Sequence, residues 1–136
     1  MNKILFFGAA LLLMFASCSK DDDPAAYYVK YEVTFKTQKT GIRVEAYFNT
    51  EKSVETMISQ TQSNNFFWEG TYGPVEKGFL TNLACSTIEE DMYGRMKVYE
   101  GEIQARIYVS RDKEPFVIKA DQIGVGSVSL NYKIDF

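Results

Sequence analysis

The sequence predicts an all-β domain, an antiparallel sandwich of seven or eight short strands of the immunoglobulin-like kind. Two observations support this prediction. Apolar and polar residues alternate with a period of two through most of the chain after Pro24, and turn-forming residues interrupt the alternation at short intervals. Strands with one apolar face must bury that face against another sheet, so a sandwich follows. A small closed barrel is the alternative fold.

The alternation is clearest at Val29, Tyr31, Val33 and Phe35, which are separated by charged or polar residues. The segment 53–62 is less regular, because its apolar residues also fit one turn of a helix. Residues 88–95 are polar and predict the longest loop, and 111–114 predict a hairpin turn. We expect strands at residues 29–36, 42–48, 53–62, 66–72, 79–87, 96–110, 116–120 and 128–134.

Residues 1–17 have the layout of a targeting segment. Lys3 precedes an apolar run from Ile4 to Ala16, which is 13 residues long, shorter than the roughly 20 that a membrane-spanning helix needs. The sequence Phe15-Ala16-Ser17-Cys18 then resembles the lipobox of bacterial lipoproteins. The resemblance implies cleavage before Cys18, which becomes the first residue of the mature chain and its lipid attachment point. An ordinary signal peptide with an incidental cysteine is the alternative.

Residues 18–26 are expected to form a flexible acidic tether. Its residues Lys20, Asp21, Asp22 and Asp23 resemble the export signal that carries lipoproteins to the outer face of certain Gram-negative cells. This implies an outer membrane lipoprotein at the cell surface. A solvated linker at the periplasmic face is the alternative, because runs of aspartate repel one another and stay extended.

Residues 27–136 are enough for one domain and too few for two. The chain has a net charge of −3 with scattered charges, so no basic patch predicts nucleic acid as a partner. It has no histidine, which removes the usual base at neutral pH and the commonest nitrogen ligand of metals. We therefore expect no catalytic residue, metal or cofactor, and a membrane contact through the lipid on Cys18.

Three features were weighed as chemical sites. Cys85 lies in phase with apolar residues and has no basic neighbour, so we expect a small buried side chain rather than a reactive thiol. Glu89-Glu90-Asp91 lacks the alternating spacing of a calcium loop, and a solvated loop is the better interpretation. Glu69 beside Trp68 is the one acid next to a large apolar group, which leaves a hydrolase as a remote alternative.

The candidate ligand contacts are aromatic. Trp68, Tyr72, Tyr93 and Tyr99 could stack on a sugar or anchor a protein partner if they are exposed. A tryptophan on a central strand often fills the core instead, and we favour the core for Trp68. The tyrosine-containing segment 88–99 is the stronger candidate, because binding residues concentrate on loops held by a rigid scaffold.

Residues 27–134 resemble the small β-sandwich lipoproteins related to the MmpS-type transport accessory proteins. The matching features are Phe67-Trp68, Lys77-Gly78-Phe79, the segment from Gly101 to Val109, and Gly124-Val125-Gly126. The resemblance implies a periplasmic or surface accessory domain and assigns no functional residue.

The sequence therefore supports a first hypothesis and one principal alternative. The first is a lipid-anchored binding lipoprotein that recognises a protein or a glycan at the cell surface. The alternative is a periplasmic accessory to transport or envelope assembly. The two hypotheses need different surfaces. A surface binder needs exposed aromatic residues at one end of the sandwich, whereas an accessory protein needs an apolar patch or an unpaired edge strand.

Overall fold

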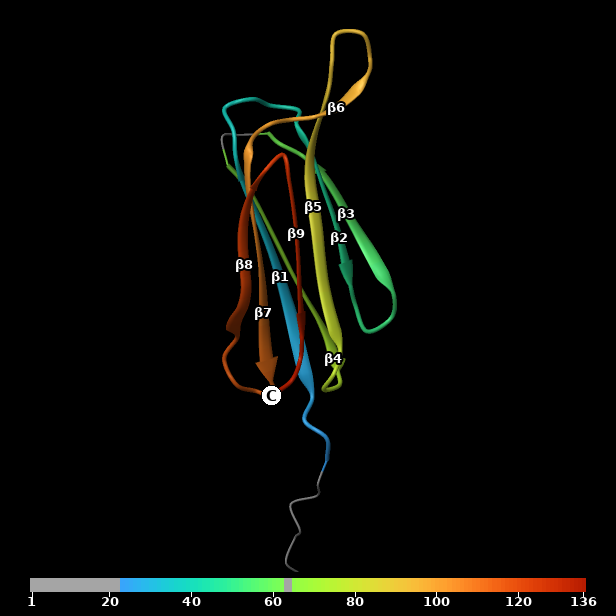
Figure 1. Cartoon of the computed structure of the whole chain (residues 1–136), viewed down its shortest axis with the longest axis vertical. Coiled ribbons are helices and arrows are strands. Elements are labelled where there is room, and N and C mark those ends of the chain that lie inside the picture. Colours follow the sequence, from blue (N-terminus) through green and yellow to red (C-terminus); the bar gives the residue numbers. More distant parts are fainter. Residues whose placement is uncertain (1–22, 63–64) are drawn as a thin grey trace, which may run out of the picture.

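A computed structural model describes residues 23–62 and 65–136 (Figure 1). Within these residues all regular structure is β, in nine strands that form two antiparallel sheets. The predicted all-β sandwich is confirmed, and the alternative closed barrel is wrong because the two sheets stay separate. The expected signal peptide, Cys18, Lys20, Asp21 and Asp22 lie outside the described residues.

The four-stranded sheet has the order β4-β1-β7-β8. Its strands are β4 (Asn65–Val75), β1 (Tyr27–Lys36), β7 (Glu102–Arg111) and β8 (Val117–Val125). In the five-stranded sheet β3 lies at one edge and β2 follows. Strand β5 comes next and pairs on its other side with β6 and β9. Its strands are β3 (Val54–Gln60), β2 (Arg43–Asn49), β5 (Leu80–Glu90), β6 (Met96–Val98) and β9 (Ser127–Lys133). No helix of the described residues is long and apolar enough to cross a membrane.

The core lies between the sheets and is formed by the inward positions of the alternating strands. Val29, Tyr31, Val33 and Phe35 of β1 are at most 1% exposed, as their period of two predicted. The inward residues of β7 behave in the same way, from Ile103 to Val109. Burying such side chains contributes about 1.5–3 kcal/mol each relative to leaving them in water.

The structure has more strands than expected because the segment 96–110 is not one strand. Its first part, β6, pairs with β5 in the five-stranded sheet, and its second part, β7, lies in the four-stranded sheet. The chain crosses between the layers at Tyr99 to Gly101. The predicted loop 88–95 is also shorter than expected, since β5 continues to Glu90 and pairs with β6.

The two ends of the sandwich differ. At one end, which we call the entry end, the chain enters β1 and the C-terminus lies nearby (Figure 1). Here the N–H of Asp112 donates to the carbonyl of Ala26 at 2.6 Å, and the Tyr27 hydroxyl donates to the carbonyl of Phe136. The opposite end, which we call the distal end, carries the β1–β2 loop and the projecting β5–β6 hairpin (Figure 1).

Candidate functional site

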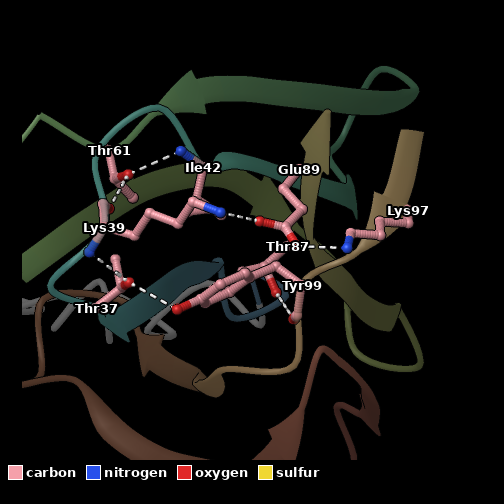
Figure 2. Close-up of polar contacts among 8 residues, drawn as sticks. All are labelled: Thr37, Lys39, Ile42, Thr61, Thr87, Glu89, Lys97 and Tyr99. Carbon is pink, nitrogen blue, oxygen red and sulfur yellow. Dashed lines mark hydrogen bonds and ion pairs between the residues drawn. The ribbon is translucent and has the colours of Figure 1, made fainter. Parts of the chain in front are cut away.

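A buried threonine holds the distal end together. The Thr87 hydroxyl donates to the carbonyl of Tyr99 at 2.8 Å, and the Thr87 N–H donates to the carbonyl of Gly126 at 2.9 Å. Tyr99 lies where the chain leaves β6 for the other sheet, and Gly126 lies where it passes from β8 to β9. Thr87 of β5 therefore holds both crossings between the layers, one through its hydroxyl and the other through its backbone N–H. Figure 2 shows the contact with Tyr99.

Both crossings need glycine. Gly126 has a φ of +75°, and a Cβ there would lie 2.5 Å from Cγ1 of Val98. A Cβ on Gly101 would lie 2.4 Å from a ring carbon of Phe35. These distances are shorter than any van der Waals contact, so a side chain at either glycine would force the neighbouring side chain or the backbone to shift at the base of the hairpin.

The β1–β2 loop is tied to the same region by hydroxyl groups. The Thr37 hydroxyl donates to the Tyr99 hydroxyl at 3.3 Å and accepts from the Lys39 N–H at 3.0 Å. The Thr61 hydroxyl accepts from the Ile42 N–H at 3.0 Å and donates to the carbonyl of Lys39 at 3.1 Å (Figure 2). The loop is therefore held at both of its ends.

A charged group crosses from this loop to the hairpin. The Glu89 carboxylate lies 2.5 Å from Nζ of Lys39 and 3.2 Å from Nζ of Lys97 (Figure 2). The hydrogen bond from Lys39 holds the pKa of Glu89 below its ordinary value, and the same bond raises the pKa of Lys39. Because both lysines are more than half exposed to water, the pairing orients the side chains more than it stabilises the fold.

The hairpin turn is built around Asp91. Its carboxylate accepts the N–H groups of Tyr93 and Arg95 at 2.8 and 2.9 Å, and it lies 2.8 Å from Nε of Arg95. These contacts, led by the Arg95 N–H, lower the pKa of Asp91. Gly94 takes a φ of +77°, which suits the tight turn. The tip is thus a defined structure.

This hairpin exposes apolar side chains. Met92 is 89% exposed and Tyr93 is 76% exposed, and Met96 and Val98 follow on β6. The Arg95 guanidinium lies 5.2 Å from the centre of the Tyr93 ring, so one face of that ring is covered. Methionine adapts to irregular surfaces, and tyrosine and arginine are favoured where proteins meet. The arrangement suits contact with a partner.

The structure divides the four predicted aromatic contacts. Trp68 and Tyr72 are half-buried on β4, where both pack against Phe48 with ring centroids 5.1 and 5.0 Å apart. Tyr99 is half-buried at the distal end, edge-on to Phe35 at 5.9 Å. Tyr93 alone projects from the hairpin. Trp68 therefore packs against the core, as favoured above, but is not fully buried. The four aromatic residues do not form one surface.

The candidate thiol and the acidic residues 89–91 lie in surroundings that support the fold. Cys85 is 4% exposed, and burial raises the pKa of its thiol to about 12, which confirms the buried side chain expected there. Glu89 and Asp91 are engaged by cations and backbone N–H groups as described. Within the described residues, no group of three or more potential metal-ligating side chains lies close enough together to hold an ion.

Sequence reasoning missed part of this end of the molecule. Lys39 and Lys97 were not singled out, although they meet on Glu89 from different segments. Met92 and Met96 were not singled out, although methionine in an otherwise polar segment is an unusual choice for a solvated loop. That composition is the signal that could have found them.

No protein-family model matches the chain, and a comparison with curated proteins gives no significant match. The resemblance to the MmpS-type family therefore stays a prediction.

Proposed function

We propose that this protein is a lipid-anchored binding lipoprotein of the outer membrane, displayed at the cell surface, that contacts a protein partner through the β5–β6 hairpin. The observation that supports the proposal most directly is the position of the hairpin. The described chain starts at the entry end, and the exposed Met92 and Tyr93 lie at the opposite end (Figure 1). A lipid on Cys18 would therefore leave the hairpin farthest from the membrane.

The anchor and the orientation are tested on intact cells. Cys18→Ala should move the protein out of the membrane fraction without unfolding it, because two acyl chains are enough for stable anchoring. External trypsin should cleave the wild-type protein and should spare a variant in which Lys20, Asp21, Asp22 and Asp23 are alanine. A Cys18→Ala protein that stays membrane-bound after a salt wash contradicts the lipid anchor.

The contact surface is tested by photo-crosslinking in the same cells. A photoreactive amino acid at Met92 should give discrete adducts of higher mass, and one at Lys113 in the β7–β8 turn should not. Both positions are exposed, but Lys113 lies at the entry end. Adducts that form equally from both positions would count against the hairpin as the contact surface.

A periplasmic accessory role is the second candidate, favoured by the edge of the five-stranded sheet. Strand β3 is that edge, and its Val54 and Ile58 are 66% and 60% exposed. A membrane partner in the periplasm could add a strand here. Protection of wild-type protein from external trypsin, together with adducts from Ile58, would favour this role over surface display.

A further inference from the structure

The outer face of the five-stranded sheet has an unusual composition. Where β5 pairs with β9, the facing outward residues are Ser86 with Ser127, Ala84 with Ser129, and Asn82 with Asn131. Solvent-facing positions of an antiparallel sheet commonly carry charged or long polar side chains. On this face the outward side chains are short and uncharged, so the surface at its centre lies close to the backbone.

Tyr47 rises beside this low area. It lies opposite Ala84 on the neighbouring strand and is 45% exposed. Its hydroxyl donates to Oε2 of Glu45 at 3.3 Å, so the side chain leans along β2. Because Ala84 has only a methyl group, a face of the Tyr47 ring stays open to the adjoining space.

A hollow of about 410 Å³ occupies that space, which is within the range of about 300–1,000 Å³ usual for small-molecule sites. Tyr47 forms one side and Gln122 of β8 reaches the other. It is lined by Tyr47, Ala84, Ser86, Gln122, Ser127 and Ser129, and also by Cys85 and Val128, which are buried.

The polar groups of the hollow have hydrogen-bonding capacity to spare. Within the described residues, the side chains of Ser86, Ser127, Ser129 and Gln122 have no hydrogen-bond partner in the chain. Each hydroxyl can donate one hydrogen bond and accept two, and the amide can do both. None of these groups carries a charge. On the neighbouring strand β2, Nε of Arg43 lies 2.9 Å from Oε1 of Glu45, and neither residue lines the hollow.

We propose that this hollow binds a neutral carbohydrate, with Tyr47 against the apolar face of a sugar ring and the serine and glutamine side chains on its hydroxyl groups. An aromatic ring provides apolar contact area, and neutral donors and acceptors match sugar hydroxyls. Among the described residues that line the hollow none is a cation, so a phosphate or an acidic sugar would gain no ion pair within it. This assignment rests on the proposed function in one respect only, namely that a displayed domain meets glycans.

Saturation-transfer NMR on the full chain tests the proposal. The protein is kept in micelles of a detergent without a sugar headgroup, because a maltoside could occupy the hollow. Cellotetraose, mannotetraose and a tetramer of N-acetylglucosamine serve as neutral probes, and sialyllactose serves as the acidic one. We expect signal transfer to at least one neutral probe and none to sialyllactose.

Three variants locate the site. Tyr47→Ala should weaken binding about tenfold, the loss expected for one aromatic contact. Tyr47→Phe should retain most of it, since it keeps the ring and loses only the hydrogen bond to Glu45. Ser129→Arg should abolish binding by filling the hollow, and it points into solvent, so the fold should tolerate it. The urea midpoint of each variant is the folding control.

The outcomes separate this inference from the proposed function. Tyr93→Ala is the matched control on the hairpin and should leave sugar binding unchanged. Failure of all three neutral probes, or binding that survives Ser129→Arg, overturns the carbohydrate site and leaves crosslinking from Met92 intact. If sugar binds but Met92 forms no crosslinks, the hairpin contact is overturned and the carbohydrate site stands.

Discussion

The outer faces of the two sheets differ in how far their polar side chains pair with one another. On the four-stranded sheet, Arg106 lies 2.8 Å from Glu32 and 3.4 Å from Asp121, and Lys30 lies 4.3 Å from the centre of the Tyr108 ring. On the five-stranded sheet, the serines at the centre form no such contacts within the described residues. A face whose groups satisfy one another serves the fold, whereas unpaired hydroxyls in a hollow are available to a ligand.

The largest expected effect is on the alkylation rate of the Cys85 thiol, which lies directly beneath the hollow. Cys85 lies between Ala84 and Ser86, but its side chain points into the core and its pKa is about 12 instead of 9.0. At about pH 8, alkylation in the folded protein should be at least about a thousandfold slower than in denaturant, because the thiolate reacts and the pKa difference sets its population. Iodoacetamide labelling followed by mass spectrometry measures the rates.

Cys85→Ala is the blank for this measurement. Rapid labelling of the folded protein would mean that the hollow opens through the sheet, and the contrast between an accessible face and a closed core would fail at β5.

Arg106→Met tests the paired face. Glu32 is 9% exposed, and without the guanidinium its carboxylate would be buried with no cation. We expect the free energy of unfolding to fall by about 2 kcal/mol, measured from urea midpoints. Adding Glu32→Gln to the variant should restore part of the loss. An unchanged midpoint in Arg106→Met would show that this face is not held by its own charges.

Glu89→Gln tests paired charges at the surface, where the two lysines are more than half exposed and the Glu89 side chain is 13% exposed. Lys39 and Lys97 depress the pKa of Glu89 in the folded state, so their contribution is present above the unfolded pKa and is lost as pH falls through the folded pKa. The urea midpoint of the variant should be slightly below that of wild type at about pH 7, and the two should converge between about pH 5 and pH 2. A difference that persists in acid would point to packing instead of charge.

Replacing the serines should have the smallest effect. Ser86→Ala, Ser127→Ala and Ser129→Ala each remove a hydroxyl that has no partner within the described chain. We expect each to change the free energy of unfolding by less than about 0.5 kcal/mol, the usual range for surface substitutions. A loss of about 1 kcal/mol or more at any of them would show that the hydroxyl supports the fold, and the contrast between the two faces would weaken.

The core was predictable from the sequence because a period of two is a local signal. The inward residues of β1, β2 and β7 follow from alternation alone. The break between β6 and β7 was missed, although the apolar positions change from even-numbered (Met96, Val98) to odd-numbered (Ile103, Ala105) across it. The break is set by distant partners, namely Thr87 beneath Tyr99 and Phe35 beside Gly101.

The candidate sites were partly predictable for a related reason. Tyr93 was found because an aromatic residue in a polar segment is visible in the sequence. The hollow was missed because Tyr47, Ser86 and Ser129 come from three strands, and a serine on the wet side of a strand looks like any solvated position. Only the pairing of β5 with β2 and β9 brings the three together.

The central position of β1 has a mechanical consequence. A load applied between a lipid on Cys18 and a partner on the hairpin would pull along β1, which is hydrogen-bonded on one side to β4 and on the other to β7. Both ladders would then be strained in shear, with their bonds sharing the force instead of opening one after another. Under the proposed function, a domain loaded this way would resist rupture and would keep its partner bound against flow. Single-molecule pulling between Asp23 and Gly94 would measure that resistance. The comparison is pulling between Asp23 and Val75, which is paired with Tyr27 at the entry end of β4, because this geometry opens the β1–β4 ladder one bond after another.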